Sequence, residues 1–220
     1  MSDPMEFLLW VKGPMFELAL TIFGIGLAAR IVEIFLLGRK PNYAEPRRGE
    51  LAPGFRTLIS RTVADPGTFA RAPFDVVVGL VWHLGFLIAL LLFIPHIELI
   101  NSLLGLAWPG LPNPLVDAVT AVTILSLIAV LIHRITHPVK KYISTFEDYL
   151  IWVATFLPLI TGYLAYHRLI NPYPLILGLH ILCVEIFLIL LPFTKLTHIF
   201  TAFIARWYNG ATFGRKGVAS

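Results

Sequence analysis

The stretch LGLHILCVEIFLILLPFTKLTH, residues 177–198, places His180 and His198 at either end of an otherwise almost wholly apolar run. A run of this length matches the roughly 20 apolar residues that a transmembrane helix needs. An ionisable side chain inside such a run is costly and therefore counts as a functional hypothesis by default. The stretch thus predicts both a membrane helix and a candidate functional site.

Four other stretches have the same character. The chain of 220 residues is 57% hydrophobic and 14% charged, whereas a soluble domain carries about 25% charged residues. No ten-residue alternating segments recur, and lipid offers no partner to exposed backbone groups. We therefore expect an all-α integral membrane bundle, a single domain over 1–220, with five spans at about 14–37, 75–99, 115–134, 148–167 and 174–196, the last ending at 196 or running on to about 206.

The basic residues are distributed unevenly over the connections. They gather after the first, third and fifth predicted spans, while the remaining segments hold only Lys12 and Arg168. By the positive-inside rule, the N-terminus lies outside and the C-terminus in the cytoplasm. The net charge of +4 does not indicate a nucleic-acid partner, and the single cysteine, Cys183, argues against an iron–sulfur cluster held by this chain's own thiolates.

The long connection, residues 38–76, contains GFRTLISRTV at 54–63. Its apolar residues fall on one helical face, which predicts a short amphipathic helix at the cytoplasmic surface. Two interpretations stay open for it, an anchor in the lipid headgroups or a docking surface for a partner. The cytoplasmic tail, 207–220, has the same two interpretations.

Two spans supply histidines in pairs. His180 and His198 are eighteen residues apart, so on one helix they share a face and lie about 27 Å apart along the axis. The second span, in WHLGFLIALLLFIPHIEL (82–99), carries His83 and His96 and runs antiparallel to the fifth. Since neutral imidazole is a good axial ligand for haem iron, we expect His83 and His198 at an inner haem, and His96 and His180 at an outer haem.

One part of this geometry depends on a helix distortion. The thirteen residues from His83 to His96 give about 20 Å and a rotation of about 220°, so an unbroken helix aims them at different faces. Pro95 directly precedes His96 and can kink or open the helix there, and Pro192 can do the same in the fifth span. The chain has no C-x-x-C-H, which predicts two non-covalent b-type haems.

The other ionisable residues have mainly structural interpretations. His137 and His167 lie at span ends, and Arg30 with Glu33 forms an expected ion pair. His133 and Arg134 are candidate contacts of a haem propionate, against a simple interfacial role. Glu185 is a candidate quinone-site or proton-carrying residue, against a hydrogen bond to a neighbouring helix.

This pattern resembles the gamma subunit of respiratory nitrate reductase, over about residues 14–206 and most closely in LLPFTKLTHIF (190–200). The segments WHLGFLIALLLFIPHIEL, WPGLPNP and HRITHPVKKYISTFEDYL look more like membrane cytochromes of sulfite-reductase-linked and hydrogenase-linked complexes in the same superfamily. The resemblance implies a dihaem cytochrome b with quinone chemistry at the outer haem. It also implies a cytoplasmic iron–sulfur partner, heterodisulfide-reductase-like or ferredoxin-like.

The resulting hypothesis is a respiratory membrane subunit in a bacterial or archaeal cytoplasmic membrane. It would move electrons between menaquinone or ubiquinone at the outer haem and the iron–sulfur partner. A transporter or proton relay is the alternative, which inverted repeats and discontinuous helices would favour. A purely structural anchor is a third class, and the cost of four membrane histidines argues against it.

Overall fold

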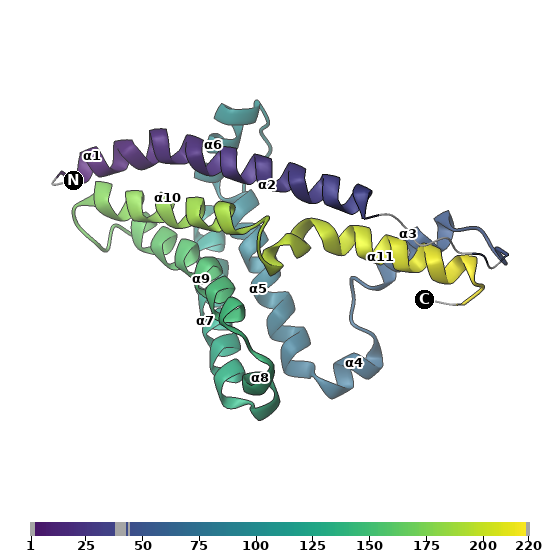
Figure 1. The fold of residues 1–220 in the computed structure, drawn as a ribbon. Coiled ribbons are helices and arrows are strands. Elements are labelled where there is room, and N and C mark those ends of the chain that lie inside the picture. Colours follow the sequence, from purple (N-terminus) through teal and green to yellow (C-terminus); the bar gives the residue numbers. More distant parts are fainter. Residues whose placement is uncertain (1–2, 38–42, 44, 219–220) are drawn as a thin grey trace. The chain divides into compact units, whose positions relative to one another are not determined.

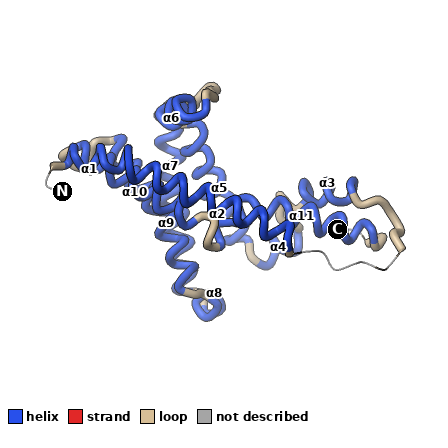
Figure 2. The backbone as a smooth tube through the Cα atoms, turned by 45° about the horizontal axis from the view of Figure 1, so that its top comes forward, coloured by secondary structure: helices blue, strands red, loops and turns tan. Residues whose placement is uncertain are grey.

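The computed structural model describes residues 3–37, 43 and 45–218, and every regular element in those residues is a helix (Figures 1 and 2). The chain begins with α1 (Pro4–Trp10), a π-helical turn (Val11–Met15) and α2 (Phe16–Leu36). The remaining elements are α3 (Leu51–Ser60), α4 (Pro66–Arg71), α5 (Pro73–Leu92), α6 (Ile94–Leu104), α7 (Asn113–Thr136), α8 (Pro138–Ile143), α9 (Phe146–Tyr166), α10 (Tyr173–Leu190), a 3-10 turn (Lys195–Thr197) and α11 (His198–Arg215). The predicted all-α class is confirmed for this part of the chain.

Five helices are long and apolar enough to cross a membrane: Pro4–Leu36, Pro73–Leu92, Asn113–Thr136, Phe146–Tyr166 and Tyr173–Leu190. Most of their apolar side chains face outward. In the most apolar stretch of each helix, only 11% of the residues of Pro73–Leu92 and 33% of those of Phe146–Tyr166 are buried within the protein. Apolar surface on this scale needs a lipid environment. The chain is therefore a multi-pass membrane protein, as expected.

The third and fourth spans agree with the sequence-based ranges to within two residues, and the other three differ for local reasons. The first helix starts at Pro4 rather than near 14, because a π-helical turn accommodates Pro14, which has no N–H. The second span ends at Leu92 rather than 99, and the fifth ends at Leu190 rather than continuing through 196 or 206. The segment of the predicted amphipathic helix is helical as α3, and its place at the cytoplasmic surface stays a prediction.

The helices form two compact units. The first contains Met1–Leu20 and Phe74–Leu188, and the second contains Thr21–Pro73 and Ile189–Ser220. The predicted cytoplasmic loop, 38–76, therefore contributes α3 and α4 to the second unit, as the predicted tail contributes the end of α11. Residues 38–42 and 44 of that loop, and 219–220 of that tail, lie outside the described residues.

The core of the first unit lies between α5, α7 and α9. Ala89, Ile124, Leu127 and Leu159 are buried there, and aromatic side chains pack around them. One of these, Trp152, donates its indole N–H to the Leu127 carbonyl oxygen at 2.8 Å, which links α9 to α7. Small residues bring the helices together, since a Cβ added at Gly85 of α5 would lie 1.8 Å from Thr123 Oγ1 of α7.

The second unit is also held together at small residues. Gly26 of α2 lies against Pro192 and Phe193, where an added Cβ would come within 2.6 Å of the proline ring. Gly54 of α3 lies against Trp207 of α11, where an added Cβ would be 2.7 Å from the indole nitrogen. Close helix contacts of this kind are typical of membrane helices, whose large side chains face lipid.

The close contact of Gly85 generates a stability prediction. We expect Gly85→Ala to lower the free energy of unfolding by about 1–3 kcal/mol, because the new methyl group overlaps Thr123. The Thr123 side chain is fixed by its hydrogen bond to the Val119 carbonyl, at 2.7 Å, and cannot easily turn away. Thermal unfolding in detergent measures the effect.

Gly79→Ala is the matched control on the same helix, since nothing lies within 4 Å of a Cβ added there. It should unfold at or above the temperature of the unchanged protein, because alanine favours a helix. Equal melting temperatures for the two variants would contradict the packing account.

Candidate functional site

The site begins at a break in the second span. α5 ends at Leu92, Phe93 adopts an extended conformation (φ −82°, ψ 124°), and α6 starts at Ile94 with Pro95 in its first turn. The last four carbonyl groups of any helix lack intrahelical partners, and in an apolar span each unsatisfied group costs several kcal/mol. A break here therefore requires donors from elsewhere in the chain.

Three of these carbonyl oxygens receive donors from later residues. The indole N–H of Trp108 donates to Leu91 at 2.6 Å, and the backbone N–H of Leu111 donates to Leu92 at 2.9 Å. His96 Nδ1 donates to Ala89 at 2.8 Å. The loop after α6 thus folds back onto the end of α5 and makes the break stable.

The break sets the orientation of His96. The expected distortion at Pro95 is confirmed, and it lies between the two histidines of the span. The His96 ring faces that of His180 on α10, with the centroids 6.1 Å apart and the planes 16° apart. The structure therefore brings together the two histidines that the sequence assigns to the outer site.

His180 is positioned by α9. Its Nδ1 donates to the carbonyl oxygen of Pro158 at 3.0 Å, and Thr161 Oγ1 lies 3.4 Å from the same nitrogen. Gly162 leaves room for the ring, because an added Cβ would be 2.9 Å from His180 Cε1. Backbone and side chain of one helix turn thus hold this imidazole.

All four histidines of the predicted ligand set share one hydrogen-bonding pattern. Besides His96 and His180, His83 Nδ1 pairs with the Gly79 carbonyl oxygen and His198 Nδ1 with that of Lys195, both at 2.7 Å. A carbonyl oxygen can only accept, so Nδ1 carries the proton and the lone pair of the neutral ring lies on Nε2. This tautomer is the one that metal-bound histidines with a second-shell carbonyl adopt.

The second predicted pair is divided between the two units. His83 is an exposed residue of α5 in the first unit, where its ring lies 3.5 Å from that of Trp82. His198 is the first residue of α11 in the second unit. His180 and His198 do not lie on one helix, contrary to the prediction, because α10 ends at Leu190 and the chain turns before α11.

The donor set at His96 and His180 suits a haem. Among the described residues, no group of three or more His, Cys, Asp or Glu side chains could hold a metal ion. A porphyrin supplies four nitrogen ligands and needs only two from the protein, and both imidazoles here carry the lone pair on Nε2. The residues therefore fit bis-histidine ligation.

Glu185 is the unusual polar group near this pair. It lies five residues beyond His180 on α10, and its side chain is fully buried. Among the residues that the structure describes, neither carboxylate oxygen has a hydrogen-bond partner, so no bond to a neighbouring helix explains it structurally. A carboxyl group without a partner in an apolar span is held far more easily as the neutral acid than as the anion.

Several other ionisable residues have structural partners at the ends of the first unit. His167 Nε2 lies 2.7 Å from Asp117 Oδ1, which joins the end of α9 to the start of α7. His133 lies 3.8 Å from Asp75, which Lys140 also contacts, and its ring packs on Phe74. Arg134 donates to Ser144 at 2.9 Å and lies 3.8 Å from Asp148. These contacts support an interfacial role, and the propionate contacts of His133 and Arg134 stay a prediction.

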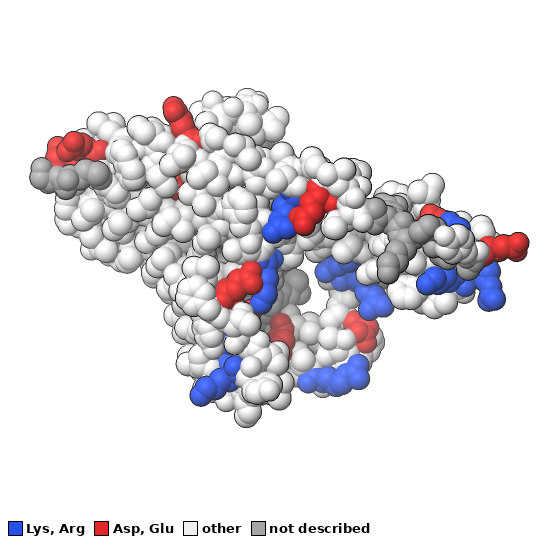
Figure 3. Space-filling view, viewed as in Figure 1, with Lys and Arg blue, Asp and Glu red and all other residues white. Residues whose placement is uncertain are grey.

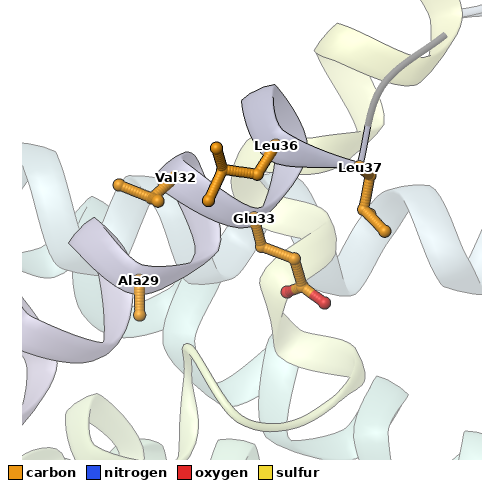
Figure 4. Close-up of a pocket in the computed structure, with 5 residues that line it drawn as sticks. All are labelled: Ala29, Val32, Glu33, Leu36 and Leu37. Atoms are coloured by element: carbon orange, nitrogen blue, oxygen red, sulfur yellow. The ribbon is translucent and has the colours of Figure 1, made fainter.

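An open groove on α2 does not resemble a ligand site. Its lining residues are Ala29, Val32, Glu33, Leu36 and Leu37, all from one stretch of chain (Figure 4). Its one charged group, Glu33, lies 2.6 Å from Arg30, which confirms the expected ion pair. Arg30 also donates Nε to the carbonyl oxygen of Pro192, in the turn after α10, at 2.8 Å.

We expect Trp108→Phe to lower the free energy of unfolding by about 1–3 kcal/mol, because the Leu91 carbonyl loses its donor inside an apolar region. Trp10→Phe is the control, since it changes an indole that is 40% exposed. Thermal unfolding in detergent or nanodiscs compares them. A Trp108→Phe protein as stable as the control would contradict the role of this loop.

Comparison with known proteins adds one distant relationship. A protein of Nitratidesulfovibrio vulgaris (strain Hildenborough) is 28% identical over 218 residues, covering 94% of this chain and 93% of the relative. The similarity thus extends over nearly the whole of both chains. No protein-family model and no solved structure matches this chain.

Proposed function

We propose that this chain is a dihaem cytochrome b of the respiratory nitrate reductase gamma superfamily. It would serve as the membrane subunit of a redox complex and exchange electrons between the quinone pool and a cytoplasmic iron–sulfur subunit. The observation that carries the proposal is the shared tautomer of His83, His96, His180 and His198, together with the approach of the His96 and His180 rings to 6.1 Å. When bound, haem b supplies reversible one-electron chemistry at an iron with two imidazole ligands.

The protein's own contribution is to hold these imidazoles in place. The carbonyl groups of Ala89 and Pro158 fix the rings of His96 and His180, and Gly162 leaves space beside the latter. A hydrogen bond from Nδ1 to a carbonyl also makes Nε2 a more basic ligand. His83 and His198 are the proposed ligands of the inner haem.

The distribution of Lys and Arg supports placing the iron–sulfur partner on the cytoplasmic side of the membrane. Lys and Arg gather after the first, third and fifth spans, so the ends of α2, α7 and α10 are the proposed cytoplasmic ends. An iron–sulfur subunit, heterodisulfide-reductase-like or ferredoxin-like, would meet the protein there. The pair at His96 and His180 would then lie toward the outside, where quinone is proposed to react.

Glu185 is the proposed proton carrier of that reaction. Oxidation of a quinol releases two protons with its two electrons, and reduction of a quinone takes them up. A carboxyl group that is fully buried and without a partner can accept or give one proton in either direction. Five residues of helix place it about 7.5 Å from His180 along the axis and about 140° around it.

We expect His180→Leu and His96→Leu each to reduce the haem content from two per chain to one, because each removes an axial ligand of the same haem. The pyridine haemochrome assay measures this ratio, and His83→Leu and His198→Leu should give the same loss at the other haem. His137→Gln changes an exposed histidine outside the ligand set and should retain both haems. A colourless unchanged protein would instead favour the proton-relay alternative.

We expect Glu185→Gln to slow the reduction of haem by a quinol at least tenfold without changing haem content, because the amide cannot take up a proton. Thermal stability should be unchanged or higher, since a buried ionisable group is replaced by a neutral isostere. Stopped-flow spectroscopy with a menaquinol or ubiquinol analogue gives the rate. Glu98→Gln, at an exposed position of α6, is the control, and equal rates in the two variants would refute the role of Glu185.

A further inference from the structure

We propose that the outer face of α3, formed by Leu51, Phe55 and Ile59, is inserted into the interfacial layer of an anionic phospholipid bilayer. The three side chains are 66%, 58% and 74% exposed. Val63, three residues beyond the end of the helix, is 76% exposed. The proposal decides between a lipid anchor and a partner-docking surface, and it holds whether or not the chain binds haem.

The opposite face of α3 is already occupied by α11. An added Cβ at Gly210 would lie 2.4 Å from Thr57 Oγ1, and one at Gly214 would lie 2.3 Å from the Pro53 ring. The salt bridge between Arg215 and Glu50, at 2.8 Å, fixes the start of α3, and the backbone N–H of Arg47 donates to the Arg215 carbonyl oxygen at 2.9 Å. α3 is thus fixed in rotation about its own axis.

This fixed rotation turns the large apolar side chains outward. Successive residues of a helix are rotated by about 100°, so Leu51, Phe55 and Ile59 fall within an arc of about 80° around the helix axis. The centre of this arc lies about 130° around the axis from the direction midway between Gly54 and Thr57, which face α11. A helix on a soluble domain buries its large apolar side chains and exposes small and polar ones. The reverse arrangement is that of a helix in contact with lipid.

The charges beside this face match an anionic surface. Arg56 is exposed and lies about 60° beyond the edge of this arc, Arg61 is exposed directly after the last residue of α3, and α3 itself contains no acidic residue. Glu50, at its start, is paired with Arg215. Long basic side chains of this kind keep their charged ends at the level of lipid phosphates while their methylene groups follow apolar surface. Figure 3 shows that Lys and Arg side chains gather over the α3–α11 region in this view.

The size of the face argues against a protein partner. A stable protein interface buries roughly 800 Å² on each side, and three or four side chains supply only part of such an area. For insertion into a bilayer a small face is sufficient, because the five spans already hold the chain at the membrane. A short amphipathic helix with basic flanks then adds a local contact.

Spin labels at single cysteines test the proposal. Cys183 is the only cysteine, so a Cys183→Ser protein accepts one label at Phe55→Cys, Ile59→Cys or, as the control, Ser60→Cys. Ser60 is exposed and lies outside the apolar arc. The protein is reconstituted in nanodiscs of phosphatidylcholine with phosphatidylglycerol, without a partner. Power saturation then compares collisions with oxygen, which concentrates in lipid, and with a water-soluble nickel chelate.

We expect the labels at 55 and 59 to collide several-fold more with oxygen than with the nickel chelate, and the label at 60 to show the opposite ratio. Water exposure at all three positions would overturn the proposal and favour a surface that awaits a protein. Protection from both reagents at 55 and 59 would also overturn it, because the face would then be covered by protein.

A second arm tests the charge. Replacing phosphatidylglycerol with phosphatidylcholine, or introducing Arg56→Gln with Arg61→Gln, should reduce the ratio of oxygen to nickel collisions at 55 and 59 at least twofold. An unchanged ratio in both cases would overturn the preference for an anionic lipid. Gel filtration and thermal unfolding of each labelled protein show that it is folded.

Discussion

The rest of this structure depends on one constraint: where a helix ends inside an apolar span, its open carbonyl groups need hydrogen-bond donors from the protein itself. The chain breaks two of its spans, after Leu92 and after Leu190, and both breaks have dedicated donors. Trp108, Leu111 and His96 serve the first. At the second, the Phe193 N–H and the Thr194 hydroxyl donate to the Leu190 carbonyl oxygen, and Arg30 donates to the Pro192 carbonyl oxygen in the turn that follows. Each break is followed by a histidine whose Nδ1 bonds a backbone carbonyl, His96 after the first and His198 after the second. The features that interrupt the helices are therefore also those that orient the proposed ligands.

Packing in both units follows from the lipid environment. Glycines lie where the helices approach most closely, as Gly85, Gly26 and Gly54 do. Large apolar side chains lie on the outward surfaces of the helices. Since lipid tails are as apolar as leucine, burial alone does not hold such helices together, and close backbone approach and hydrogen bonds decide which helices pair. The indole bond from Trp152 to Leu127 and the imidazole bond from His180 to Pro158 are two such bonds, both involving α9. α9 is accordingly the helix that connects the core of the first unit to the candidate site.

The sequence predicted the helical class and the number of spans, because hydropathy reports these directly. The pairing of His96 with His180 followed from the antiparallel order of their two spans, whereas the thirteen-residue spacing from His83 to His96 did not by itself favour it. The sequence also predicted the distortion at Pro95, since proline lacks the N–H that a helix interior needs. It named Pro192 as a residue that can kink or open the fifth span, but it did not predict that the helix ends at Leu190, because the residues around Pro192 in 187–193 are all apolar and suggest a continuous span. The contributions of Trp108, Pro158 and Gly162 were missed as well. Trp108 stands in a loop rich in proline and glycine, and its long-range bond to Leu91 has no local sequence pattern.

The loop that closes the first break has a consequence for how the chain enters a membrane. The donors for Leu91 and Leu92 lie at Trp108 and Leu111, so they leave the ribosome well after α5 itself. Until they arrive, the end of α5 has open carbonyl groups that are tolerated at the water boundary and not in hydrocarbon. The second span therefore reaches its final depth only when α6 and its loop have been made. Translocation of residues 73–112 is expected to finish as one cooperative step rather than helix by helix.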